Sequence, residues 1–204
     1  MRGRFVTLEG IDGAGKSSHL RWIARFLRAR GTRVKVTREP GGTPVGERLR
    51  ELVLGSRHRL HAETETLLMF AARREHLAHV IEPALTRGIW VLCDRFTDAT
   101  YAYQSGGSGV GWGKVRQLEK WVHPGRQPDL TILFDVAPAT GRKRTGRKGK
   151  ADRFERERNA FFGRVRRAYL RRAAAYPRRI RVLDANKSLP EVKKELERIL
   201  LRFC

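Results

Sequence analysis

The stretch GIDGAGKS, residues 10–17, fits the pattern G-x-x-x-x-G-K-[ST]. Residues 5–8 before it form an apolar run rich in strand-forming residues, and residues 18–27 after it have helical periodicity. A glycine-rich turn between a strand and a helix directs backbone N–H groups and the positive end of the helix dipole at phosphate oxygens. Lys16 can then reach the β- and γ-phosphates, and the Ser17 hydroxyl can ligate Mg²⁺. The stretch therefore predicts a site for a nucleoside triphosphate.

Apolar runs of strand length recur along the whole chain, at residues 5–8, 34–37, 89–93, 130–134 and 180–183. Helical periodicity fills most of the gaps between them. Strands that alternate with helices indicate an α/β protein with a parallel sheet covered by helices on both faces. Such sheets bind ligands at the carboxyl ends of their strands. We therefore expect the functional residues directly after the five predicted strands.

Two of the helical segments carry apolar stripes. The first stripe drifts somewhat from ideal helical periodicity and consists of Leu67, Phe70, Leu77, Val80 and Ile81. The second stripe is shorter and consists of Leu118, Trp121 and Val122.

Length and composition predict one domain over residues 1–204, with enough apolar residues, 40%, for a full core. No apolar run approaches the ~20 residues of a membrane span, so we expect no membrane association. Met1 is followed almost at once by the first predicted strand, which argues against a signal peptide. Cys93 and Cys204 are the only cysteines. This low cysteine usage favours a reducing, cytoplasmic location.

The formal net charge of +23 arises from 44 Lys and Arg against 21 Asp and Glu. Such an excess can serve a nucleic-acid partner or a site for polyanionic substrates. Because the cations are spread along most of the chain, we favour solvated, Arg-rich surfaces as the main explanation. Nucleic-acid binding stays open as the weaker alternative.

Residues 140–153 form a polar, basic segment that contains TGRKRTGRKGKAD at 140–152. With almost no apolar residues, the segment cannot pack into a core. In a compact enzyme such a stretch is typical of a mobile lid that closes over phosphates. The competing interpretation is a disordered surface loop.

Asp94, Arg95 and Phe96 directly follow the third predicted strand. An aspartate at the end of an apolar strand beside the strand of the phosphate loop is placed to hold Mg²⁺, directly or through water. Arg95 would then contact a transferring or acceptor phosphate, where a cation stabilises developing charge.

These motifs together resemble the thymidylate kinases, which are P-loop nucleoside-monophosphate kinases, along the whole chain. The resemblance implies the fold of that family, ATP-dependent phosphorylation of dTMP to dTDP in dTTP synthesis, Mg²⁺ as cofactor and a homodimer. The segments that carry it are EGIDGAGKSS (9–18), TREPGGT (37–43), AARREHL (71–77), IEPAL (81–85), CDRF (93–96), Tyr103-Gln104 and Asp152-Arg153.

The resemblance also implies an acceptor site for dTMP. Arg73 and Arg95 match residues that hold its phosphate, and Arg50 matches a residue near the base. Asp12 matches a residue that faces the 3′-hydroxyl of the sugar. Glu39, in the loop after the second strand, is expected to orient the cations of this site.

Recognition of the base and sugar follows by the same matching. Thr100 and Gln104 match residues that hydrogen-bond the thymine edge, and Tyr103 matches a ring packed where a 2′-hydroxyl would lie. The family usually stacks an aromatic ring on thymine, four residues before the acceptor-site arginine. Met69 occupies that position relative to Arg73, whereas Phe70 is the neighbouring aromatic residue, so both stay candidates.

For the donor, the resemblance assigns ATP to the phosphate loop and to two arginines of the lid. Gly13 stands where other members of the family have an arginine, which implies that the lid supplies a catalytic cation, with Arg153 as the best match. The predicted catalytic residues are Lys16, Arg95 and Arg153. The predicted ATP contacts are Gly10, Asp12, Gly13, Ala14, Gly15, Lys16, Ser17, Ser18, Arg142 and Arg144, and Mg²⁺ is expected on Ser17 and Asp94.

Two other functions are alternatives to dTMP phosphorylation. A deoxynucleoside kinase would phosphorylate a neutral hydroxyl and would need a general base, for which Glu39 is the only tempting residue. A nucleic-acid-binding P-loop ATPase would explain the charge, but would leave the acceptor-site residues without a role.

Overall fold

In the computed structural model, the described residues are 2–55, 60–145 and 153–204, with only the backbone described for 153–158. Five parallel strands form one sheet in the order β2-β3-β1-β4-β5. This confirms the predicted sheet. The strands are β1 (Phe5–Glu9), β2 (Val34–Arg38), β3 (Trp90–Asp94), β4 (Leu130–Asp135) and β5 (Ile180–Asp184).

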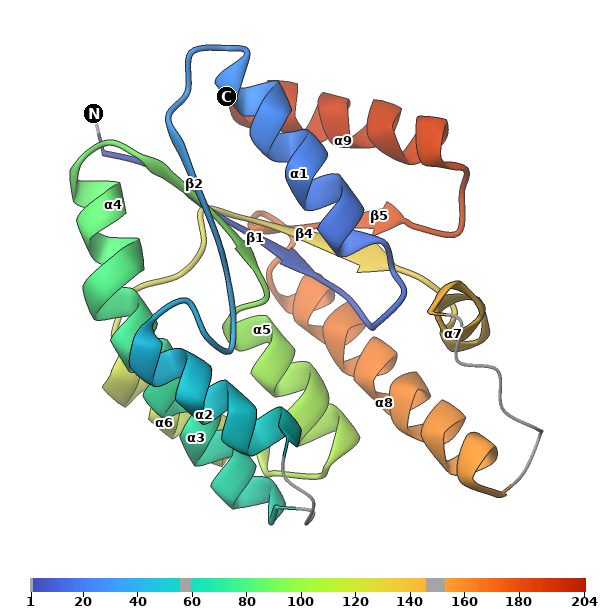
Figure 1. Cartoon of the computed structure of the whole chain (residues 1–204). Coiled ribbons are helices and arrows are strands. Elements are labelled where there is room, and N and C mark those ends of the chain that lie inside the picture. The colour runs from blue at the N-terminus through green and yellow to red at the C-terminus, as the bar shows by residue number, and fades with distance from the viewer. Residues whose placement is uncertain (1, 56–59, 146–152) are drawn as a thin grey trace.

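The helices cover both faces of this sheet, with α1 and α9 on one side and α4, α5 and α8 on the other (Figure 1). No described helix is long and apolar enough to cross a membrane. The elements are α1 (Lys16–Arg28), α2 (Pro44–Gly55), α3 (Ala62–His76), π-helical η1 (Leu77–Ile81), α4 (Glu82–Thr86), α5 (Thr97–Thr100), π-helical η2 (Tyr101–Gly107), α6 (Trp112–Val122), α7 (Pro138–Arg144), α8 (Arg153–Ala175) and α9 (Leu189–Phe203).

The two apolar stripes are only partly buried. Leu77 and Ile81 lie in the core, and the π-helical turn η1 explains the drift of their stripe, because a π turn inserts an extra residue. Leu67 on α3 and Trp121 on α6, however, are 54% and 80% exposed. Helical periodicity identified these faces without indicating that part of them lies on the surface.

Strand register places the functional residues at one edge of the sheet. Leu8 of β1 pairs with Asp94 of β3 on one side and with Ile132 of β4 on the other. The phosphate loop therefore starts beside Asp94, as the sequence predicted, and α1 begins at Lys16 immediately after the loop.

The phosphate loop also packs, backbone against backbone, on the short helix α7 (Figure 1). Gly13 has a φ of 78°, and a Cβ at this position would lie 2.0 Å from the carbonyl oxygen of Gly141. A Cβ at Gly141 would in turn lie 2.7 Å from the carbonyl oxygen of Asp12. Only glycine fits this contact, so an arginine at position 13 would force α7 away from the loop.

We predict that Gly141→Ala lowers the free energy of unfolding by about 1–3 kcal/mol, because the methyl group overpacks a contact with backbone that cannot rotate away. Gly113→Ala is the matched control, since this exposed helical glycine has nothing within 4 Å of its Cβ position. The control should gain about 0.5–1 kcal/mol through higher helix propensity. Urea denaturation measures both variants, and equal midpoints would contradict the packing argument.

Candidate active site

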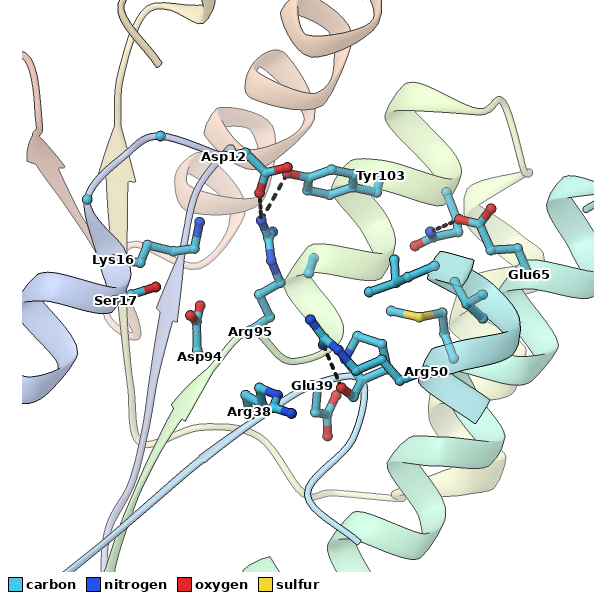
Figure 2. A pocket seen from close by; sticks show the side chains of 18 of the residues that line it. Asp12, Lys16, Ser17, Arg38, Glu39, Arg50, Glu65, Asp94, Arg95 and Tyr103 are labelled. Carbon is cyan, nitrogen blue, oxygen red and sulfur yellow. Dashed lines mark hydrogen bonds and ion pairs between the residues drawn. The ribbon is translucent and has the colours of Figure 1, made fainter. Parts of the chain in front are cut away.

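A cavity of about 660 Å³ opens where the carboxyl ends of β1, β2 and β3 meet the helices α2, α3 and η2 (Figure 2). The structure brings together most of the residues that the sequence predicted for a site. Those that line the cavity are Asp12, Gly13, Gly15, Lys16, Ser17, Ser18, Glu39, Arg50, Asp94, Arg95, Tyr103 and Gln104.

Lys16 folds back over the phosphate loop. Its Nζ donates hydrogen bonds to the carbonyl oxygens of Gly10 at 2.8 Å and of Ile11 at 3.0 Å. Burial, and then the nearby positive charge of Arg95, lower the pKa of Lys16 to about 8. The ammonium group is thus held at the mouth of the loop, still mostly protonated at neutral pH.

Arg95 has a φ of 73°, the one positive φ of a non-glycine residue within the described ranges. Its guanidinium lies across the cavity floor (Figure 2), where Nη2 donates to Asp12 Oδ1 at 2.7 Å and to the Tyr103 hydroxyl at 3.0 Å. Nη1 donates to the Tyr169 hydroxyl at 3.1 Å. A left-handed backbone is costly for a residue with a side chain, and these contacts hold it in place.

Glu9, the last residue of β1, supports Arg95 from beneath the cavity. Its fully buried carboxyl group accepts hydrogen bonds from the Phe96 backbone N–H at 2.7 Å and from the Tyr169 hydroxyl at 2.8 Å. Burial, and then the charge of Asp98, raise the pKa of Glu9 to about 8. Glu9 and Tyr169 were not predicted as site residues, although an acidic residue at the end of a buried strand is a usable signal for Glu9.

Glu39 and Arg73 form a second buried group, in which Glu39 lines the cavity and Arg73 lies behind it. Glu39 Oε2 accepts from Arg73 Nε at 2.8 Å, and Oε1 lies 3.0 Å from His76 Nδ1. Burial raises the pKa of Glu39, but Arg73 and His76 outweigh it, so the pKa lies below its ordinary value. Arg73 Nη2 donates to Thr100 Oγ1 at 3.1 Å, while its buried Nη1 has no hydrogen-bond partner among the described residues.

Two oxygen groups beside the phosphate loop suit a divalent cation. Ser17 and Asp94 both line the cavity, and their side chains approach the same space (Figure 2). Asp94 Oδ1 is buried and lacks a hydrogen-bond partner in the described part of the chain. Mg²⁺ prefers such oxygen ligands, so this pair fits the ion.

Three residues predicted for the acceptor site, Phe70, Arg73 and Thr100, are not among the residues that line the cavity. Phe70, only 1% exposed, packs in a cluster with Tyr101, Val110 and Val115, and is not among the lining residues. Met69 lines the cavity instead. Of the two candidates for stacking on a base, the structure therefore brings only Met69 to the site.

The predicted lid is described only in part, since residues 146–152 and the side chain of Arg153 lie outside the described residues. Arg142 Nη1 donates to Asn159 Oδ1 at 3.2 Å, and Arg144 Nη1 donates to the carbonyl oxygen of Ala185 at 2.7 Å. Neither arginine lines the cavity.

Glu65 and Arg38 line the cavity without having been predicted. Arg38 pairs with Glu47 at 3.0 Å, and Glu65 Oε1 accepts from Gln104 Nε2 at 2.7 Å. Arg38 directly follows the predicted strand 34–37, where functional residues were expected, whereas no local pattern indicates that Glu65 faces the site.

Comparison with known proteins adds independent information. The family model described as thymidylate kinase matches residues 8–196. The thymidylate kinase of Nitrosospira multiformis is 61% identical over 198 residues, 97% of each chain, and that of Methylobacillus flagellatus is 59% identical over 203 residues, 100% of this chain and 99% of the relative. The crystal structure of thymidylate kinase from Ehrlichia chaffeensis superposes with a TM-score of 0.80 at 33% identity, covering 98% of this chain and 99% of that one.

We predict that Glu39→Ala lowers the free energy of unfolding by about 3–5 kcal/mol, because it leaves the buried Arg73 charge uncompensated. Glu75→Ala is the matched control on α3, where Glu75 pairs with His79 at 3.5 Å on the exposed surface. An exposed pair contributes only about 0–1 kcal/mol. Similar denaturation midpoints for the two variants would show that Glu39 does not balance Arg73.

Proposed function

The chain belongs to the thymidylate kinase family and phosphorylates dTMP to dTDP, and we propose that the cavity described above is where ATP serves as the phosphoryl donor. One observation carries this assignment: the phosphate loop and an acceptor-side arginine converge on the same space. Lys16 and Ser17 lie at one end, and Arg50 and Glu65 lie at the other, with Arg95 between them (Figure 2).

The reaction needs little from the protein by way of proton transfer. The attacking atom is an oxygen of the dTMP phosphate, whose second pKa of ~6 leaves it largely ionised at neutral pH. The protein must therefore position the two nucleotides and neutralise their charge. We assign that work to Lys16 on the donor side and to Arg95 at the transferring phosphoryl group, with Asp12 facing the 3′-hydroxyl of the acceptor sugar.

We place Mg²⁺ on Ser17 and Asp94, for which the unpartnered Asp94 Oδ1 is the supporting observation. When bound, the ion would neutralise charge on the β- and γ-phosphate oxygens.

The alternative acceptor, a neutral deoxynucleoside, is not favoured. It would require a general base, and Glu39 is poorly suited to that role. Both of its carboxylate oxygens are occupied, by Arg73 and His76, and its pKa is lowered. A nucleic-acid-stimulated ATPase is not favoured either, because both relatives named above are thymidylate kinases matched over nearly the full chain.

Residues 140–153 are proposed to cover the phosphates as a lid that is anchored on the phosphate loop through Gly141, with Arg153 as the catalytic cation. The contact between Gly13 and Gly141 supports a cation from outside the phosphate loop, since no side chain fits at position 13. Both cysteines are free, which is compatible with the cytoplasmic location that we propose.

We predict that Lys16→Ala reduces kcat/KM for dTMP phosphorylation at least ~100-fold, the usual scale for removing a group that stabilises transition-state charge. Lys35→Ala, on the exposed part of β2, should retain the parent rate. Formation of dTDP from dTMP and ATP is measured by chromatography, with thymidine as a second acceptor. Preferred phosphorylation of thymidine, or equal rates for Lys16→Ala and the parent, would refute the assignment.

We further propose a homodimer formed through α3 and α6. Leu67 and Trp121, 54% and 80% exposed, flank an apolar hollow of about 500 Å³ between these helices. An exposed apolar patch of this kind usually marks an interface, and a second copy of the same chain is the commonest partner.

Trp121→Glu is expected to convert the dimer to a monomer, because it buries an unpaired charge at the interface. Leu189→Glu is the matched control, since Leu189 is 62% exposed on α9 across the sheet (Figure 1). Sedimentation equilibrium gives the mass of each variant. A monomeric parent, or a Trp121→Glu variant that stays dimeric, would rule out this interface.

A further inference from the structure

Gln104 is the buried amide at the acceptor end of the cavity. The residue lies on η2, is 4% exposed and lines the cavity. Its Nε2 donates a hydrogen bond of 2.7 Å to Oε1 of Glu65 on α3. Its other polar atom, the carbonyl oxygen Oε1, is buried and has no hydrogen-bond partner among the described residues.

The contact with Glu65 determines which end of the Gln104 side-chain amide is the NH₂ group and which is the carbonyl oxygen. A carboxylate can only accept hydrogen bonds, so it must face the NH₂ group of Gln104 and not its carbonyl oxygen. The carbonyl oxygen is then left as an acceptor without a donor, and a buried acceptor of this kind costs free energy until a donor reaches it. The geometry therefore prepares Gln104 to accept a hydrogen bond, not to donate one.

The distinction matters for pyrimidine bases. The ring nitrogen N3 of thymine or uracil carries a proton and donates, whereas N3 of cytosine has a lone pair and accepts. A carbonyl oxygen accepts a hydrogen bond from N3–H of thymine or uracil, but it repels the lone pair on N3 of cytosine.

We propose that Glu65 is a specificity-determining positioning residue, which holds the amide of Gln104 in the one orientation that accepts from thymine N3–H and opposes cytosine. The inference rests on the proposed function and on the resemblance described above, in which Gln104 matches a residue that hydrogen-bonds the thymine edge. Glu65 acts through Gln104 and not on the reacting atoms.

Glu65→Gln tests the role of the charge with almost no change in volume. A neutral amide at position 65 can pair with Gln104 in either orientation, so Gln104 can then turn its NH₂ group toward cytosine N3. The KM for dTMP should rise, the inhibition constant of dCMP should fall, and their ratio should change by at least about tenfold, the scale of one buried hydrogen bond. The kcat for saturating dTMP should stay within about twofold of the parent, since the reacting groups are untouched.

The matched control is Glu75→Gln on the same helix, where the carboxylate faces only the exposed His79. It should keep the parent KM, kcat and dCMP inhibition. Gln104→Leu and the double variant Glu65→Gln/Gln104→Leu complete a double-mutant cycle, so the test does not depend on a single variant. If Glu65 acts through Gln104, adding Glu65→Gln to Gln104→Leu leaves the selectivity ratio unchanged.

Two failures are distinguishable. If the parent and Glu75→Gln do not phosphorylate dTMP, the proposed function fails. If both are active but Glu65→Gln keeps the parent's ratio of dTMP KM to dCMP inhibition constant, or if Glu65→Gln still shifts that ratio in the Gln104→Leu background, the inference about Glu65 is overturned.

Discussion

The left-handed backbone of Arg95 is the constraint around which the site is built. At the end of β3 the chain must turn a guanidinium out of the sheet and across to the phosphate loop, and a φ of 73° achieves this at a cost of about 1–3 kcal/mol. Glu9 offsets that cost from β1 by binding the Phe96 N–H, and Tyr169 ties the arrangement to α8. Three segments far apart in sequence therefore set the position of one cation.

Buried acidic side chains recur around this edge of the sheet. Besides Glu9, Glu39 holds Arg73 of α3, and Asp98 of α5 binds Arg172 and Arg179 at 2.8 and 2.6 Å. Buried ion pairs contribute little net stability, because desolvation of both charges offsets their attraction. Their effect here is geometric, since each pair fixes one helix or loop against the sheet that carries the phosphate loop. In a chain with a net charge of +23, these few acids locate particular arginines.

The positions of the five strands along the chain, the phosphate loop and the Asp94-Arg95 pair could be predicted because each depends on local patterns. An apolar run of four to six residues favours a strand wherever it lies, and a parallel α/β sheet always gathers its strand ends at one edge. Met69 and Phe70 show where this reasoning stops. Adjacent residues on α3 point in different directions, and periodicity cannot tell which direction meets a cavity. The exposed positions of Leu67 and Trp121 have the same cause.

By itself, the sequence determined the fold class, the family and the chemical groups available for phosphoryl transfer, because these follow from motifs and spacings along the chain. Only the tertiary structure decided which groups support them. Glu9 and Tyr169 are 160 residues apart, and Glu65 and Gln104 are 39 apart. Gly13 and Gly141 meet through their backbones, with no side-chain pattern to mark the contact. Such pairings depend on how whole helices pack against the sheet, and no local pattern encodes that packing.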